Sequence, residues 1–178
     1  MMKFLIGVAL LVVAVVVAGL VMPTSYAVEK EITIDATPAQ VHAYVGHLTK
    51  WEEWTPWKDA DPTMTVQPGD KSTGVGASQS WTGKDGDGEL TFTKCDEASG
   101  IAYDMAFIIE GTRAPATCEM TYSESDGKTT VVWTMEGDTS DFMPPVVGGL
   151  MTPLMSSSIG GMFDQGLDKL KEQVEASK

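Results

Sequence analysis

The sequence has little positive charge and few residues of the kinds that bind metals. It carries 12 Lys and Arg against 25 Asp and Glu, a net charge of −13, and Arg113 is its only arginine. So acidic a surface repels phosphate backbones and anionic lipid, and we expect no nucleic-acid partner. There are two histidines, His42 and His47, and two cysteines, Cys95 and Cys118, with no Cys-x-x-Cys pair. These residues do not support a zinc site, and we predict neither a metal nor a cofactor.

Catalytic motifs are equally scarce. The sequence has no nucleophile elbow and no recognisable Ser-His-Asp set, although a dispersed triad would escape such a reading. We predict that His42 lies on a solvated helix face and that Arg113 occupies a solvated hairpin tip, with a ligand carboxylate as the alternative there. Tyr103 is a candidate hydrogen-bond donor inside a pocket. An even number of cysteines permits a Cys95–Cys118 disulfide but does not require one.

An uncharged apolar run over residues 4–22 is the clearest physical signal. Its 19 residues approach the roughly 20 needed to span a bilayer core. Lys3 precedes the run and acidic residues follow it, which puts the remaining chain on the periplasmic or extracellular side. We favour an uncleaved anchor over residues 1–27 and one domain over 28–178. The alternatives are a signal peptide cleaved after Ser25-Tyr26-Ala27, which gives a secreted domain, and a buried core helix.

Beyond this segment, apolar residues mostly alternate with polar ones, which predicts antiparallel strands joined by short turns. Hairpin-length separators such as Ser99-Gly100 exclude helical crossovers between the later strands. The predicted strands cover residues 28–34, 74–82, a segment around Leu90 and Phe92, 101–109, 116–122 and 131–135.

Helical patterns occur near both ends of this meander. Thr37 and Gln40 have the spacing of a capping box, which predicts the start of a first helix. A second short helix is predicted over residues 51–54, and Pro56 ends it. A longer helix is predicted near the C-terminus from five apolar residues at helical spacing: Ile159, Phe163, Leu167, Leu170 and Val174. Because helices and strands are segregated along the chain, the predicted class is α+β.

Several motifs carry a family resemblance. They include residues 26–41, the tryptophan-rich segment 48–57, Gly-Val-Gly-Ala at 74–77 and residues 129–137. Over residues 26–172 the chain resembles the START-like helix-grip superfamily, also called SRPBCC or Bet v 1-like, and within it the exported polyketide cyclase/dehydrase branch. The resemblance implies a curved antiparallel sheet that grips a long C-terminal helix, with a ligand cavity between them. A Pro-x-x-Tyr linker after the hydrophobic segment, here residues 23–26, also belongs to this resemblance and favours the anchor.

The resemblance makes the inward-facing side chains candidates for lining a cavity, whereas in an ordinary sandwich they would be core. The candidate ligand-binding residues are Trp81, Phe92, Tyr103, Met105, Phe107, Met120, Trp133, Met135, Met155, Phe163 and Leu167. Trp51, Trp54 and Trp57 either edge the entrance or, as we favour, seal the junction between helix and sheet. The Met- and Gly-rich passage 142–161 is predicted to be a hinged lid or a loosely packed surface loop.

Three functions follow. The one we favour is a monomeric, exported domain that binds an apolar small molecule, lipid- or polyketide-like, without chemistry. The second is an enzyme of the polyketide cyclase or aromatase type, for which no acid or base can be named from the sequence. The third is a protein-interaction module whose cavity is filled by its own core.

Overall fold

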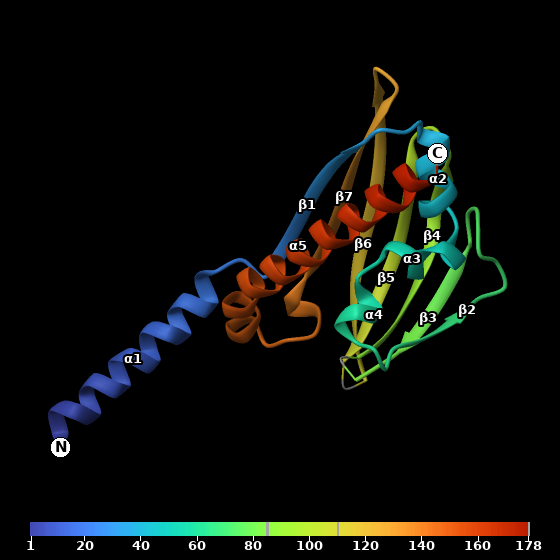
Figure 1. The fold of residues 1–178 in the computed structure, drawn as a ribbon. Helices are drawn as coiled ribbons and strands as arrows, with labels where there is room; N and C mark the ends of the chain where they lie inside the picture. Colours follow the sequence, from blue (N-terminus) through green and yellow to red (C-terminus); the bar gives the residue numbers. More distant parts are fainter. Residues whose placement is uncertain (85, 110, 178) are drawn as a thin grey trace.

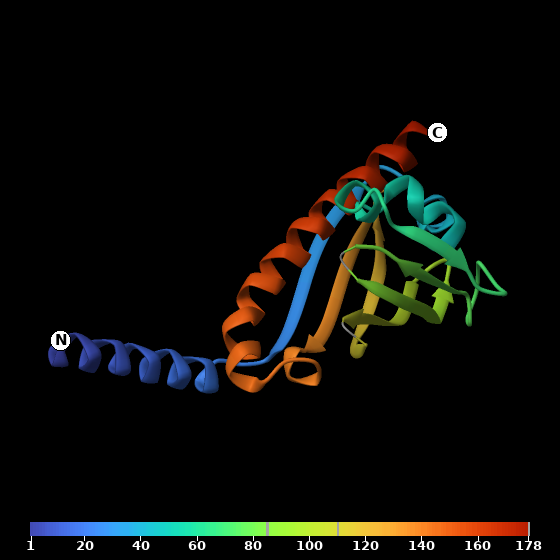
Figure 2. The same ribbon diagram turned by 90° about the horizontal axis from the view of Figure 1, so that it is seen from below.

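The computed structural model describes residues 1–84, 86–109 and 111–177, and it confirms the α+β class (Figure 1). Its strands form one antiparallel seven-stranded sheet in the order β1-β7-β6-β5-β4-β3-β2. The long helix α5 runs along one face of this sheet, and the short helices cover the same face beside it (Figures 1 and 2). A further helix, α1, projects from one corner of the molecule.

Most strands are longer than the sequence indicates, and each hairpin keeps the predicted antiparallel pairing. β1 pairs with β7 along its whole length, from Ser25 opposite Asp138 to Ile34 opposite Thr129. The first strand in sequence therefore pairs with the last, and β1 forms one edge of the sheet. The strands are β1 Ser25–Ile34, β2 Thr65–Pro68, β3 Ser78–Thr82, β4 Asp87–Asp96, β5 Gly100–Ile109, β6 Thr112–Ser125 and β7 Lys128–Asp138.

The predicted strand over residues 74–82 is partly wrong. β3 begins only at Ser78, because Gly74 and Gly76 have φ values of 75° and 84°, a left-handed conformation that interrupts a strand. Val75 between them is 59% exposed rather than facing the core. The first part of the alternating segment is therefore a turn, and the sequence did not indicate the short edge strand β2.

The helices begin and end largely where their caps indicate. Gln40 N–H donates to Thr37 Oγ1, and Thr37 N–H donates to Gln40 Oε1 at 2.9 Å, which confirms the capping box. Pro56 follows the end of α3 and precedes α4, a short helix that the sequence did not indicate. The helices are α1 Met2–Val21, α2 Pro38–Val45, η1 Leu48–Lys50, α3 Trp51–Trp54, α4 Trp57–Ala60, η2 Thr139–Asp141 and α5 Pro145–Ala176.

Of the two predictions for residues 142–161, the loose surface loop is wrong, because α5 already begins at Pro145 and continues through Pro153. The hinged lid stays a prediction. Two glycines of this passage lie where another element comes close. A side chain at Gly149 would overlap the carbonyl oxygen of Gly19 in α1, and Gly148 packs on Thr139. Tertiary packing therefore overrides the low helix propensity of these residues.

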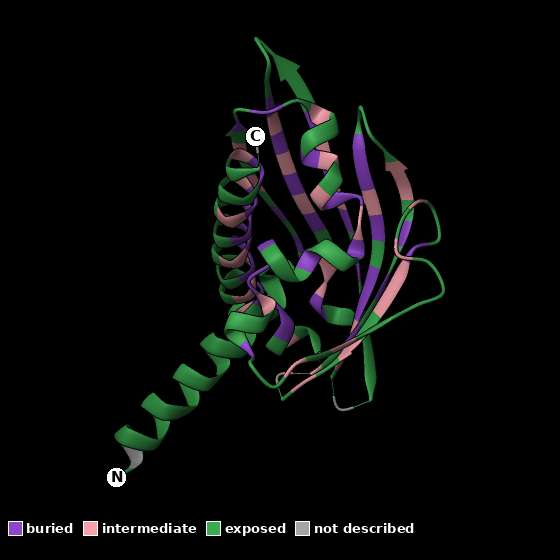
Figure 3. Ribbon diagram, turned by 45° about the vertical axis from the view of Figure 1, so that its right-hand side comes forward, coloured by how far each residue is buried: buried purple, intermediate pink, exposed green. Residues whose placement is uncertain are grey.

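The core lies between the sheet and the buried face of α5 (Figure 3). All five residues of the predicted C-terminal stripe are buried, and Phe163, Leu170 and Val174 have no accessible area. This stripe holds the helix to the sheet.

Replacing Leu170 with Ala should lower the free energy of unfolding by about 2–5 kcal/mol, because it leaves a cavity in the packed face of α5. The control is Glu172→Ala on the same helix, where an exposed side chain should change stability by less than about 0.5 kcal/mol. Urea denaturation followed by tryptophan fluorescence measures both variants. Equal stability of the two would show that α5 is not packed as described.

Candidate functional site

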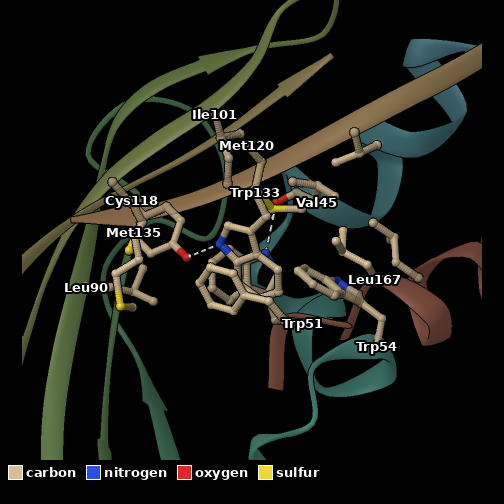
Figure 4. Close-up of a cluster of buried hydrophobic side chains, with 14 of the residues drawn as sticks. Val45, Trp51, Trp54, Leu90, Ile101, Cys118, Met120, Trp133, Met135 and Leu167 are labelled. Carbon is tan, nitrogen blue, oxygen red and sulfur yellow. Dashed lines mark hydrogen bonds between the residues drawn. The ribbon is translucent and has the colours of Figure 1, made fainter. Parts of the chain in front are cut away.

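A cluster of aromatic rings fills the centre of the space between the sheet and α5, which we call the grip (Figure 4). The indole of Trp133 on β7 stacks on the ring of Phe163 on α5, with ring centroids 3.8 Å apart and planes 5° apart. Trp54 meets Trp133 edge-on at 5.5 Å, and Trp51 meets Tyr103 edge-on at 5.4 Å. Helices α3 and α5 thus meet the sheet through aromatic rings, as expected for tryptophans that seal the junction.

Three buried indole N–H groups lie in this cluster, and two of them have acceptors (Figure 4). Trp133 Nε1 donates to the Tyr103 hydroxyl at 3.0 Å, and Trp51 Nε1 donates to the carbonyl oxygen of Val45 at 2.9 Å. Trp54 Nε1 is buried and has no acceptor among the residues that the structure describes. A buried donor left unpaired costs about 1–3 kcal/mol. The grip therefore holds one polar group whose hydrogen bond is missing.

Two ionisable groups of the grip, Cys118 and Tyr103, are neutral near neutral pH. Burial raises the pKa of the Cys118 thiol to about 12, and its Sγ lies 3.4 Å from Met105 Sδ. Burial likewise raises the pKa of Tyr103 well above its usual value. Neither group carries charge near neutral pH, so neither acts there as a general base. What they offer a bound molecule is weak hydrogen bonding in apolar surroundings.

The predicted ligand-binding residues other than Met155 come together on the inner face, and by exposure the whole set falls into two groups. Trp81, Phe107 and Met155 are half-buried, and the rings of Trp81 and Phe107 meet edge-on at 5.8 Å at one end of the sheet. The remaining predicted residues are buried: Phe92, Tyr103, Met105, Met120, Trp133, Met135, Phe163 and Leu167.

The second group leaves no room for a ligand at the centre. Trp133, Phe163 and Met120 have no accessible area, so none of them borders a space wide enough for a water molecule. The side chains that the sequence indicates as cavity lining are packed against one another in this conformation. Their contact with a ligand stays a prediction.

A larger hollow lies elsewhere, at the start of β1 and β6 and the end of β7. Its volume is about 920 Å³, and exposed residues of paired strands such as Ala27, Thr117 and Glu136 line it. It is open and shares only Met105 with the predicted set. Arg113 at its end is exposed, as expected for a hairpin residue, and forms an ion pair with Glu89 across the sheet. An exposed pair of this kind contributes little to stability.

His42 is not solvated as predicted, because α2 turns it toward the sheet. Its Nε2 lies 3.5 Å from Cys95 Sγ and its Nδ1 lies 3.4 Å from the Tyr122 hydroxyl. Burial, with a smaller effect of His47, lowers the pKa of the imidazole and keeps it neutral. Sequence reasoning missed this contact because it joins residues far apart in the chain. Among the described residues no group of three His, Cys, Asp or Glu side chains could hold a metal ion.

This combination of a curved sheet, short helices and a gripped C-terminal helix can be compared with known proteins. A family model described as "Polyketide cyclase / dehydrase and lipid transport" matches residues 25–175. The chain belongs to the polyketide cyclase/dehydrase family. The predicted resemblance is thereby confirmed at the level of the family, and no curated protein matches the chain.

Solved structures share the fold of this chain. The crystal structure of Ara h 8.0201 matches with a TM-score of 0.61 at 16% identity, over 85% of this chain and 99% of that one. A Chromobacterium violaceum protein matches with a TM-score of 0.60 at 14% identity, over 84% and 96%. A Thermus thermophilus protein matches with a TM-score of 0.59 at 17% identity, over 86% and 99%. At such identities these likenesses show the shared helix-grip fold alone.

Both cysteines are free thiols in the structure, and we expect them to differ in reactivity. Cys95 is half-buried, whereas Cys118 is buried with a pKa of about 12, so almost none of it is thiolate at pH 8. Ellman's reagent at pH 8 should modify one thiol in the folded protein and two after unfolding in urea. The Cys95→Ser variant serves as the control and should lose the first reaction. Two fast thiols in the native protein would contradict the buried position of Cys118.

Proposed function

We propose that this domain binds an apolar small molecule inside the grip, between the sheet and α5, while α1 anchors it to a membrane with the domain outside the cell or in the periplasm. Membership of a family described by lipid transport supports the class of ligand. The apolar interior, whose buried Tyr103 and Cys118 are neutral, supports it independently. Apolar burial of about 25 cal/mol per Å² would provide the affinity.

The observation that carries this proposal is the unpaired N–H of Trp54. Burying a donor without an acceptor is unfavourable, and proteins avoid it unless a water, an ion or a ligand completes the bond. Trp54 touches Trp133, whose ring in turn stacks on Phe163, so its N–H belongs to the aromatic cluster that closes the grip. A ligand with one acceptor on an apolar body would supply both the missing bond and apolar contact.

Binding then requires the closed grip to open. Met105, Met120 and Met135 give the inner face flexible side chains that can repack around different shapes. The half-buried end near Trp81 and Phe107 is where the core meets solvent, and a cavity of about 20 Å³ lies near it beside Trp57. We therefore place the entrance at this end, between α4 and strands β2 and β3.

Of the other two functions, the interaction module is favoured by one observation, the solvent-free centre of the grip. In that case the packed interior would be the functional state and the interior would bind nothing. Cyclase chemistry gains no such support, because Tyr103 and Cys118 are neutral and the partly buried His42 lies against Tyr122 and Cys95.

A first experiment asks whether the grip holds a ligand. A protease site placed before Pro23 allows the full chain to assemble in membranes and then releases the domain for solvent extraction and mass spectrometry. We expect an apolar compound in about equimolar amount. An unrelated anchored domain released in the same way gives the background. Extracts that match this background from several growth conditions would favour the interaction module.

A second experiment tests the unpaired donor. The Trp54→Phe variant lacks the N–H. Its affinity for a long-chain methyl ketone should therefore fall about tenfold more than its affinity for the matching alkane. This difference corresponds to about 1.4 kcal/mol for one hydrogen bond. Comparing the two ligands cancels the effect of the smaller ring. Trp51→Phe is the matched control, because Val45 already accepts from that N–H. Dye displacement measures both affinities for the wild-type chain and for each variant, and equal losses for both ligands in Trp54→Phe would rule out this contact.

A further inference from the structure

The first half of α5 carries an apolar stripe that faces away from the protein. Val147, Met151 and Leu154 are 46%, 36% and 64% exposed. Their spacing of 0, +4 and +7 places them on one side of the helix, whereas Gly148, Gly149 and Thr152 are buried on the other side. We call these three exposed residues the outer stripe. Exposed apolar side chains in a continuous row on a helix are typical of an interaction surface.

This part of the helix is also unusually free of charge. The chain has 37 Asp, Glu, Lys and Arg residues (12 and 25), yet none falls between Phe142 and Phe163. The other uncharged run of comparable length is that of α1. Charge returns at Asp164, where α5 continues along the sheet. An acidic protein therefore has one end that an uncharged, apolar surface can approach.

The start of α5, which carries the outer stripe, lies beside the C-terminal end of α1 (Figures 1 and 2). A side chain at Gly19 would overlap the carbonyl oxygen of Val146, so the two helices touch backbone to backbone. The 20 residues of α1 span about 30 Å, the thickness of a bilayer core. The place where α1 leaves a bilayer is thus the place where α5 begins.

Hydrogen bonds fix the connection between α1 and the domain. The carbonyl oxygen of Thr24 accepts from the backbone N–H of Thr139 at 2.9 Å, from Thr139 Oγ1 at 3.0 Å and from Thr152 Oγ1 at 3.2 Å. Thr152 Oγ1 is also within 2.9 Å of Thr139 Oγ1. The chain therefore leaves α1 through a bonded junction, which sets the direction of α1 relative to α5.

We propose that the outer stripe inserts into the outer surface of the same bilayer that α1 spans. The occupant of this surface is uncharged lipid, because the net charge of −13 disfavours anionic headgroups. Two contacts, a span and an interfacial helix face, then hold the domain in one orientation. α5 leads from the bilayer surface into the grip, which gives an apolar ligand a short path between the two. This inference rests on the proposed anchoring by α1.

The test uses the full chain in phosphatidylcholine vesicles, with a nitroxide attached to single cysteines in a Cys95→Ser background. Leu154→Cys reports on the outer stripe. Gln165→Cys is the matched control, because it is exposed on the same side of α5, about 16 Å further along the helix. Leu11→Cys, in the middle of α1, reports on the anchor. Collisions with oxygen indicate lipid, and collisions with a water-soluble nickel chelate indicate solvent.

We expect the label at residue 154 to collide several-fold more with oxygen and several-fold less with the chelate than the label at residue 165. A label at 154 that is as open to the chelate as the label at 165, with residue 11 in lipid, would overturn this inference and leave the anchor intact. A label at residue 11 that meets the chelate freely would overturn the anchor itself and the inference with it.

Discussion

The stacking of Phe163 on Trp133 is the contact on which the remaining structure depends. It joins the C-terminal helix α5 to β7, which pairs with both β1 and β6, and Trp54 of α3 packs edge-on against the same indole. A sheet whose inner face is apolar needs a cover, and α5 provides that cover with one continuous buried stripe. Because the contact is between flat rings without accessible area, it also decides that the grip is closed when empty.

The closed grip contains an apolar interior in which hydrogen bonds are almost complete. Trp133 Nε1 donates to the Tyr103 hydroxyl, and Trp51 Nε1 donates to the carbonyl oxygen of Val45 at the end of α2. Trp54 alone has a donor without an acceptor among the described residues. A protein interior tolerates such a group where a bound molecule completes it, and this one N–H is what sets the proposed site apart from an ordinary core. The shifted pKa values of Tyr103 and Cys118 favour binding over acid–base chemistry.

The two halves of α5 differ in charge and in the elements that they contact. Its second half has a polar side and a buried stripe, as a helix packed on a sheet requires. Its first half is uncharged and meets α1 through glycines, with a second apolar stripe facing outward. The same helix therefore links the proposed membrane contact to the proposed ligand site. Hydrogen bonds among Thr24, Thr139 and Thr152 fix the position of α1 relative to α5.

Local patterns in the sequence determined the helix cap at Thr37, the antiparallel hairpins, the buried stripe from Ile159 to Val174 and the apolar N-terminal helix, because each depends on neighbours within a few residues. The sequence also indicated which side chains face inward, since alternation assigns faces. Alternation could not tell whether those side chains line a space or fill it. That was decided by the approach of α5, as were the contacts of His42 with Cys95 and Tyr122, the helical state of residues 145–161 and the unpaired Trp54. Each of these depends on residues distant in the chain, whose separation only the packed tertiary structure sets.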